Sequence, residues 1–293
     1  MQQRQGLING VVAYLLWGIF PLYFVLFARS GAFEIVAYRA LWSLVVCLLV
    51  LAVMRRLGEL RDILAKPKMA LAVGVAGLLI ATNWTVYVYG VNTDRTLDAA
   101  LGYFINPLAV AALGVLVLGE KLRPLQWAAI LAGLAAVVVL LVGYGQFPFI
   151  AITLALSFGT YSLVKKVSGG AVAPVSGLAF ETATVAPIAL GFLIYLAVAG
   201  RSTVDLFSGY GALMATTGVV TAVPLLLFAA AARRVSMITL AMLQYIAPIG
   251  QFLLGWLVFH EPMPLSRWLG FGFVWIAILL FVADVALTQR QRH

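Results

Sequence analysis

The sequence predicts an all-α polytopic membrane protein with ten transmembrane helices, arranged as two inverted five-helix repeats. Its 293 residues are 64% hydrophobic and only 10% charged, whereas a soluble domain carries about 25% charged residues. Apolar runs of about 20 residues, long enough to cross a bilayer, follow one another with short connections. The two halves of the chain also match each other. We therefore expect that lipid surrounds the protein and that the chain arose by duplication of one membrane unit.

The duplication is clearest between residues 102–127, GYFINPLAVAALGVLVLGEKLRPLQW, and residues 243–268, LQYIAPIGQFLLGWLVFHEPMPLSRW. A shift of 141 positions without a gap superposes identical or similar residues. The matched pairs are Pro107 and Pro248, Gly114 and Gly255, Glu120 and Glu261, Trp127 and Trp268, Trp17-Gly18 and Phe158-Gly159, and Gly77 and Gly218. This period is too long for a solenoid and predicts two membrane units, residues 1–146 and 147–293.

Ten apolar runs can be drawn in order along the chain. They cover 7–28, 33–54, 69–91, 97–118, 124–142, 147–165, 172–199, 208–232, 236–259 and 264–287. The first contains Trp17 and Pro21 and is too long for the apolar region of a signal peptide, so we expect it to stay as a membrane helix. The sixth is the least regular, because it contains Gly159 and ends on Lys165-Lys166. The longest connection, 55–68, is polar and leaves no room for a soluble domain.

Lysine and arginine residues predict the orientation, because they concentrate in cytoplasmic connections. With the N-terminus in the cytoplasm, 14 of the 19 basic residues lie on that side, four lie outside, and Arg39 lies within the second run. Both termini are therefore expected in the cytoplasm, and the net charge of +9 is a topology signal rather than a sign of nucleic-acid binding. Since five is odd, the second unit crosses in the opposite sense, as in secondary transporters with a midplane substrate site.

Residue types that catalysis, cofactors or metals require are scarce. The one cysteine, Cys47, lies inside an apolar run and supports neither a disulfide nor a metal cluster. The two histidines, His260 and His293, are too few and too far apart for a transition-metal site. The sequence has no phosphate-binding glycine-rich loop and no HExxH motif. We therefore expect no enzyme activity, no catalytic residue, no cofactor and no metal.

Pro107 and Pro248 occupy matching positions in the fourth and ninth runs. A proline within a helix removes the hydrogen bond to the carbonyl four residues earlier, and in lipid that carbonyl needs another partner. The freed carbonyls and the polar side chains near them belong to Tyr103, Asn106, Gln244 and Gln251. Broken helices at matching positions point to a transport site; packing kinks satisfied by a neighbouring helix are the alternative.

Two charged residues, Arg39 and Glu181, lie inside apolar runs, each in the second helix of its own unit. At a helix centre such a charge costs about 2.5–3.5 kcal/mol on insertion scales, so both are candidates for function. Three hypotheses follow: the two side chains pair across the repeat axis, Glu181 carries a coupling proton, or Arg39 binds an anionic group of the substrate. The alternative is that each side chain snorkels to an interface.

Aromatic and amide side chains within the runs could complete a small-molecule cavity, although aromatic residues also mark membrane interfaces. The full set predicted to bind substrate in a central cavity is Tyr14, Trp17, Arg39, Asn83, Tyr87, Tyr103, Asn106, Tyr161, Glu181, Gln244 and Tyr245. Glu120 and Glu261, at matching helix ends, are predicted to cap the helix that follows each of them. Asp284, near the end of the last run, is predicted to be interfacial.

At these residues the sequence resembles the RarD branch of the EamA-type transporters, in the drug/metabolite transporter superfamily. The resemblance extends over nearly the whole chain and rests on blocks that occur together: AYLLWGIFPLYF, YRALWS, NWTVYVYGVN, LGYFINPL, SFGTYSLVKK, Glu181-Thr182 and LQYIAPIGQFLLG. The family commonly has His-Arg where this chain has Tyr38-Arg39, so a proton-carrying role of that histidine does not transfer to this chain.

The resemblance implies ten helices in two inverted repeats, with a cavity lined by helices one to four and six to nine, and with helices five and ten outside it. It implies an inner-membrane carrier of small metabolites or drugs, in a family named for chloramphenicol sensitivity. The cavity residues that it implies are Trp17, Arg39, Asn83, Tyr103, Asn106, Glu181 and Gln244.

The sequence thus predicts a secondary transporter that works by alternating access, as an exporter or exchanger of a small polar or amphipathic metabolite or drug. Its expected partners are that small molecule, the lipid bilayer and, as a candidate coupling ion, protons. Nucleic acid is not among them, and the oligomeric state is open. A channel-like facilitator on the same fold, and a non-transporting membrane enzyme or scaffold, are the alternatives.

Overall fold

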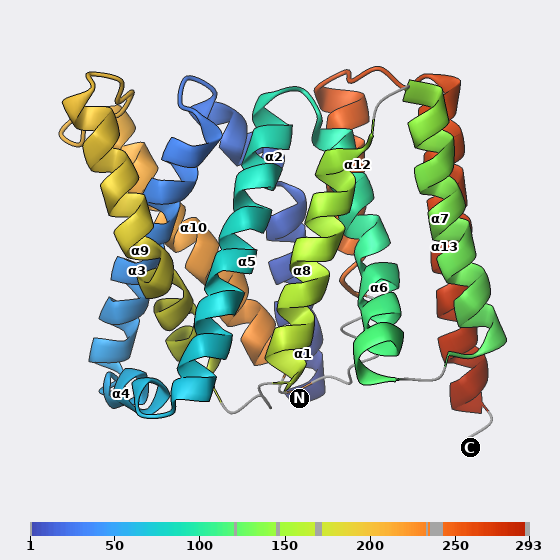
Figure 1. Cartoon of the computed structure of the whole chain (residues 1–293), viewed down its shortest axis with the longest axis horizontal. Coiled ribbons are helices and arrows are strands. Elements are labelled where there is room, and N and C mark those ends of the chain that lie inside the picture. The colour runs from blue at the N-terminus through green and yellow to red at the C-terminus, as the bar shows by residue number, and fades with distance from the viewer. Residues whose placement is uncertain are drawn as a thin grey trace.

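Long helices cross the molecule side by side (Figure 1). The computed structural model describes residues 2–119, 122–144, 147–167, 172–232, 234 and 243–290, and no strand occurs in these ranges. The first helices are α1 (Gln2–Gly18), α2 (Phe20–Phe24), η1 (Val25–Phe27), α3 (Ala32–Val53), α4 (Gly58–Leu64), α5 (Pro67–Asn92), α6 (Thr96–Leu118) and α7 (Pro124–Tyr144). The later ones are α8 (Phe149–Val167), α9 (Pro174–Val198), α10 (Gly209–Ala232), α12 (Ile246–Leu253), η2 (Leu254–Val258) and α13 (Leu265–Arg290).

Seven of the described helices are long and apolar enough to cross a membrane: α3, α5, α6, α7, α9, α10 and α13. Helix α1 and the segment that follows it, bent by 44° relative to each other, make an eighth span if the pair crosses as one. Two apolar helices, Phe149–Lys165 and Ile246–Val258, are shorter. The chain is therefore a multi-pass α-helical membrane protein. The count of ten spans stays a prediction, and part of the run 236–259 lies outside the described residues.

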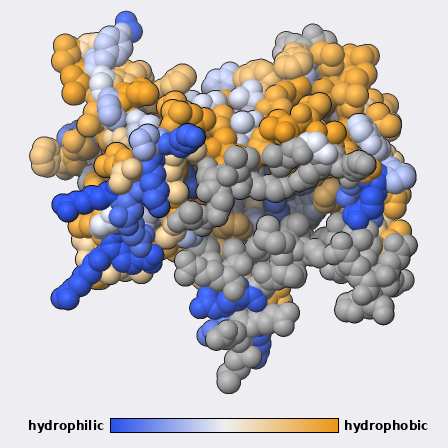
Figure 2. Space-filling view, turned by 60° about the horizontal axis from the view of Figure 1, so that its bottom comes forward, coloured by the Kyte–Doolittle hydropathy of each residue, from blue (hydrophilic) through white to orange (hydrophobic). Residues whose placement is uncertain are grey.

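The two ends of the chain belong to one end of the molecule, where α1 begins and α13 stops (Figure 1). The short helix α4 lies at the same end, which we call the terminal end. The opposite end, which we call the far end, carries the connections 28–31, 93–95, 199–208 and 259–264. In Figure 2, hydrophilic residues gather at the terminal end on the side where α4 lies, next to a largely hydrophobic flank. This distribution suits a protein whose flanks contact lipid and whose ends contact water.

Three prolines fall at different places in their helices. Pro21 lies in the first turn of α2, at the bend after α1, and Pro107 lies inside α6. Pro248 lies in the first turn of α12, because Gln244 and Tyr245 form a turn just before it. The first N–H groups of a helix have no helical acceptor in any case. Pro248 has no N–H to donate to the Gln244 carbonyl, and the helix is broken at residues 244–245, just before the proline.

The most closely packed helices come from opposite halves of the chain. Helix α3 packs on α9, α6 on α8, α7 on α13, and α1 on both α10 and α12. Helix α5 contacts α8 and α9, α10 contacts α3, and α12 contacts α6. One core cluster gathers buried side chains mainly of α2, α3, α5, α8, α9 and α10, and a second gathers those of α6, α7, α12 and α13. Both cores are thus built from the two halves together.

Two glycines at repeat-matched positions allow this close packing. A Cβ atom on Gly77 of α5 would lie 2.6 Å from the carbonyl oxygen of Glu181 in α9. A Cβ atom on Gly218 of α10 would lie 2.5 Å from the carbonyl oxygen of Trp42 in α3. Small residues at such contacts let membrane helices pack backbone against backbone. Each glycine therefore joins a helix of one half to a helix of the other.

Gly77→Ala and Gly218→Ala should each lower the melting temperature of the purified protein in detergent, because overpacking of this kind costs about 1–3 kcal/mol. Gly191→Ala in α9 is the control, since a Cβ atom there would meet no described atom within 4 Å. Its melting temperature should stay the same or rise, because alanine favours a helix over glycine. Equal melting temperatures in all three variants would contradict the two backbone contacts.

Candidate functional site

Arg39 of α3 is buried, with 4% of its surface exposed. Its Nε atom donates a hydrogen bond to Thr221 Oγ1 of α10, 2.9 Å away. Its guanidinium carbon lies 4.2 Å from the ring centre of Trp84, 5.2 Å from that of Phe24 and 5.9 Å from that of Phe20. Aromatic rings attract a cation in this position. In the described part of the chain, no carboxylate lies within ion-pair distance of Arg39.

Glu181 of α9, only 1% exposed, pairs with Lys165 of α8. The Lys165 ammonium contacts Glu181 Oε1, and the Tyr161 hydroxyl donates a hydrogen bond to Oε2 at 3.3 Å. The hypothesis that Glu181 pairs with Arg39 is therefore wrong. A lysine near a helix end has a stem long enough to place its charge several ångströms away. Lys165, which the sequence analysis counted as a topology signal, is thus the ion-pair partner of a buried carboxylate.

Asn83 joins three helices. Its Nδ2 atom, on α5, donates hydrogen bonds to the Leu154 carbonyl and to Ser157 Oγ of α8, each at 3.1 Å. The Tyr103 hydroxyl, on α6, donates to Asn83 Oδ1 at 2.9 Å. The amide is buried and both of its ends are satisfied, so Asn83 fixes the relative positions of these helices.

Asn83→Leu should lower the melting temperature, because it leaves the buried Tyr103 hydroxyl without its acceptor, a loss of about 1–3 kcal/mol. Adding Tyr103→Phe to that variant should recover part of the loss, since no unpaired hydroxyl then remains. The check is the melting temperature of both single variants and of the double variant. Strictly additive effects would contradict the hydrogen bond between the two side chains.

Three buried polar atoms near this region have no hydrogen-bond partner among the described residues: Tyr87 Oη, Asn106 Oδ1 and Gln251 Oε1. Tyr87 packs its ring on Phe24 and Tyr103, with ring centres 6.0 and 5.8 Å away. The other end of the Gln251 amide donates to the Trp17 carbonyl at 3.2 Å. Buried polar groups in proteins are normally satisfied. These atoms therefore have capacity that a ligand or water can use.

Aromatic residues of the predicted set surround these polar groups. Tyr103 and Tyr161 both pack on Phe158 of α8, with ring centres 6.4 and 5.7 Å from it. Tyr14 and Trp17 of α1 pack on each other with ring centres 5.2 Å apart. Trp17, Tyr103 and Tyr161 all pack against the first core cluster, which also contains Tyr87. The structure therefore brings Trp17, Tyr87, Tyr103 and Tyr161 together at the first core cluster.

Tyr245 lies elsewhere, since it packs on the second core cluster with Phe252 and Phe271. It does not share the cluster that contains Tyr87, and its place in the substrate cavity stays a prediction. Gln244, half-buried in the turn before α12, forms no hydrogen bond within the described ranges. Gln244 and Tyr245 form the turn before α12, whereas Gln251 lies within that helix.

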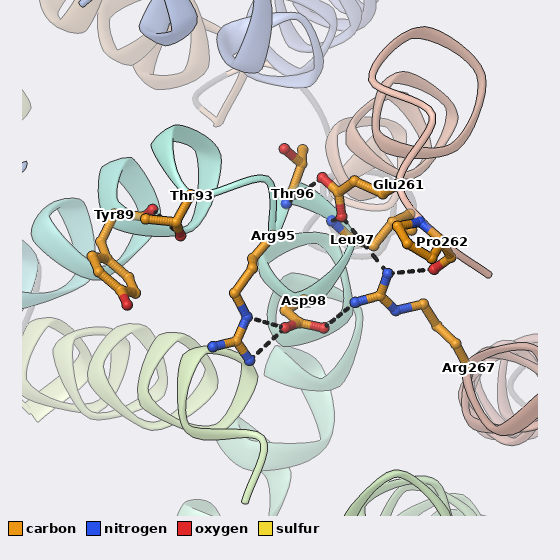
Figure 3. A network of polar contacts seen from close by, with 9 residues as sticks. All are labelled: Tyr89, Thr93, Arg95, Thr96, Leu97, Asp98, Glu261, Pro262 and Arg267. Atoms are coloured by element: carbon orange, nitrogen blue, oxygen red, sulfur yellow. Dashed lines mark hydrogen bonds and ion pairs between the residues drawn. The ribbon is translucent and has the colours of Figure 1, made fainter. Parts of the chain in front are cut away.

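Glu261, at the far end, caps a helix of the other half. It follows the π-helical segment η2, where the N–H of Phe259 donates to the Leu254 carbonyl at 2.8 Å. Both oxygens of Glu261 accept backbone N–H groups at the start of α6, including that of Leu97 at 3.0 Å (Figure 3). The prediction that Glu261 caps the following helix is wrong, because the loop after η2 lies beside α6. Glu120 lies outside the described residues.

A second carboxylate continues this far-end network. Asp98 accepts hydrogen bonds from Arg95 at 2.7 Å and from Arg267 at 3.1 Å (Figure 3). Arg267 also lies 3.8 Å from Glu261 Oε2. Burial raises the pKa of the Glu261 carboxyl above its ordinary value, while the N–H groups that it accepts and the Arg267 charge act against this shift. The network therefore holds two carboxylates and two arginines where α6 meets the start of α13.

Sequence reasoning missed two further polar contacts between the halves. Asp284 of α13 is buried and accepts hydrogen bonds from Gln126 of α7 and from Arg123, the residue before α7. Its interfacial position stays a prediction. Glu34, in the first turn of α3, accepts a hydrogen bond from Thr203 Oγ1 at 2.7 Å. Both carboxylates lie near the ends of apolar runs, where a charge gives no sign of burial in the sequence.

Long apolar helices, cores shared between two halves and buried ion pairs define a multi-pass integral membrane protein. The chain belongs to the EamA-like transporter family, whose model matches residues 4–142 and again residues 148–283. It is 46% identical over 293 residues to "Protein RarD" of Streptomyces exfoliatus, covering 99% of this chain and 92% of that protein. It is 40% identical over 287 residues to "Uncharacterized transporter YojE" of Bacillus subtilis, covering 96% and 94%. A solved crystal structure, 20% identical with a TM-score of 0.62 over 98% of this chain and 99% of that one, shows the same fold.

Proposed function

We propose that the protein is a secondary transporter that moves a small polar or amphipathic metabolite or drug across the cell (inner) membrane by alternating access, as an exporter or exchanger. The observation that carries this proposal is the set of buried polar atoms with unused hydrogen-bonding capacity. Tyr87 and Asn106 contribute it from the first half, and Gln251 from the second. A carrier needs such atoms because a substrate inside the membrane must replace the hydrogen bonds that it made with water.

The proposal includes ten spans in two inverted repeats, residues 1–146 and 147–293, with both termini in the cytoplasm. The family model matches each half separately, which supports the repeat. Helix contacts also correspond when the halves are exchanged: α1 on α12 corresponds to α8 on α6, and α10 on α3 to α5 on α9. Symmetry of this kind suits two units that rock about a shared site.

The residues of the site take different roles in this proposal. Asn83 holds α5, α6 and α8 together, since its own hydrogen bonds are already made. Tyr87, Asn106 and Gln251 bind the substrate through their free atoms. Glu181 carries a coupling proton, because protonation of its carboxylate would weaken its ion pair with Lys165 and so loosen α9 from α8.

Counterflow in liposomes tests the proposal. Liposomes with the purified protein are preloaded with an unlabelled amino acid, organic acid or chloramphenicol, and labelled compound is added outside. A carrier should take up label transiently above its outside concentration, and Asn106→Leu should slow this roughly tenfold, whereas Leu131→Ala on the exposed face of α7 should not. Label that only equilibrates would identify the channel-like facilitator, and no protein-dependent movement of any compound would contradict both.

A further inference from the structure

In the described part of the chain, every buried charged side chain except Arg39 has an ion-pair partner or several hydrogen bonds that stabilise its charge. The matched pairs and groups are Glu181 with Lys165, Asp284 with Arg123, Asp98 with Arg95 and Arg267, and Glu261 with Arg267. Glu34 lies in the first turn of α3, where the helix dipole favours a carboxylate. It accepts hydrogen bonds from Ser202 and Thr203. Arg39 has one hydrogen bond to a neutral hydroxyl and three aromatic rings.

The free part of Arg39 is the edge that carries Nη1 and Nη2. Thr221 occupies the Nε atom, and neither Nη atom has a hydrogen-bond partner in the described ranges. The rings of Trp84 and Phe24 hold the guanidinium carbon, but they offer no oxygen acceptor to its N–H groups. Two parallel N–H groups on one edge match the two oxygens of a carboxylate.

A third donor packs on the same ring as Arg39, since Phe24 contacts both the guanidinium group and the ring of Tyr87. Two other phenol groups lie beside these rings, because Tyr23 packs on Phe24 and Tyr103 packs on Tyr87. Tyr23 and Tyr103 already have partners, Thr216 and Asn83. The Tyr87 hydroxyl is buried and has none among the described residues. It can therefore donate to the same anionic group that the arginine binds.

We propose that Arg39 binds the carboxylate of a monoanionic substrate that has an aromatic or otherwise apolar body. This inference rests on the proposed transport function and names the substrate class for the same site. One unmatched positive charge balances one negative charge. A dianion would keep a net charge among apolar groups, because Arg39 supplies one positive charge and Lys165 is engaged by Glu181. A cationic substrate would meet the arginine with no intervening anion.

The aromatic surroundings indicate the body of the substrate. Trp84 and Phe24 contact Arg39. Tyr87 packs on Phe24 and on Tyr103, and Phe158 lies against Tyr103. Flat apolar groups pack well on such rings. Benzoate is therefore a suitable probe, with three ligands that keep its ring and change the charge: neutral benzamide, cationic benzylamine and the dianion phenylphosphonate.

The test measures the melting temperature of the purified protein with each probe at constant ionic strength. Saturating benzoate should raise it by about 3 °C or more, and the other three probes should raise it much less. Arg39→Gln should abolish the benzoate shift. Arg201→Gln, an exposed arginine in the connection 199–208, should keep the shift and serves as the matched control. Arg39→Lys should keep a reduced shift, since the charge remains without the two parallel N–H groups.

A second readout needs no ligand. Arg39→Met removes an unmatched buried charge and replaces it with apolar volume, so its melting temperature should equal or exceed that of the wild type. An arginine with a purely structural role would give the opposite result. The inference is overturned if benzoate gives no shift, if benzamide gives an equal shift, or if the benzoate shift persists in Arg39→Gln.

Counterflow separates this inference from the function on which it rests. Counterflow of a neutral or cationic compound that is unchanged in Arg39→Gln would keep the carrier and overturn the carboxylate class. Arg39-dependent benzoate binding without counterflow of any compound would keep the binding site and overturn transport. Benzoate counterflow in the wild type and in Arg201→Gln, lost in Arg39→Gln, is the result expected.

Discussion

Lys165→Ala should destabilise the protein by roughly 3 kcal/mol, near the lower end of the range for a broken buried ion pair. Its partner Glu181 has a side chain that is only 1% exposed, so the carboxylate would lose its counter-ion inside the bundle. The Lys165 side chain is 35% exposed, and water already screens part of the interaction, which is why the lower end applies. The measurement is the melting temperature in detergent at neutral pH.

Removing both charges should cost less than removing the lysine alone. The double variant Lys165→Met with Glu181→Gln leaves no unmatched charge. In the wild type the Tyr161 hydroxyl donates to Glu181, and the glutamine keeps an acceptor for it. The defect of Lys165→Ala should also shrink in acid, since a proton on Glu181 removes the unmatched charge. A Lys165→Ala variant as stable as the wild type would show that the pair contributes nothing.

Glu261→Ala should cost about 2–3 kcal/mol, because it removes both the cap of α6 and a negative charge close to the buried Arg267. The N–H groups of Thr96 and Leu97 would lose their acceptor in a buried place. Asp62→Ala, an exposed carboxylate on α4, is the control and should leave the melting temperature unchanged. Equal effects of the two substitutions would contradict the cap.

Glu261→Gln should change the pH dependence of stability. Burial raises the pKa of the Glu261 carboxyl in the folded protein above its ordinary value, so the folded state binds this proton more tightly than the unfolded state. The contribution of this group is then fully present below the unfolded pKa and is lost as the pH rises through the folded pKa. Melting temperatures from pH 4.5 upward should fall less in Glu261→Gln than in the wild type; parallel curves would contradict the raised pKa.

The membrane helices could be predicted from the sequence because apolar length and proline position are local properties. The run 33–54 corresponds to Ala32–Val53, and the run 172–199 to Pro174–Val198, which begins with the proline that favours a first turn. The break at residues 244–245 lies just before Pro248, whose position in the sequence had indicated a broken or kinked helix there. Membership of the EamA-like family followed from blocks of residues spread over the chain and is confirmed.

The partners of the site residues could not be predicted, because helix periodicity gives the face of a residue and not the helix opposite it. Arg39 and Glu181 are both buried as expected, but aromatic rings and Lys165 are their neighbours. The opposite charges of Arg39 and Glu181 suggested a pair, but Lys165 of α8 is the ion-pair partner of Glu181. The capping role of Glu261 was recognisable from its position at a helix end, but the helix that it caps depends on the packing of α12 against α6.

Packing between the halves also determines when the protein can assemble during synthesis. Helix α7 packs on α13, which is synthesised after it, so Arg123 and Gln126 cannot contact Asp284 until α13 has been made. A nascent chain that ends near residue 144 has its first helices in the bilayer but little of either core. Insertion and assembly are thereby separated in time, and a ribosome that stalls before α13 would leave an inserted, unassembled chain for membrane proteases to remove.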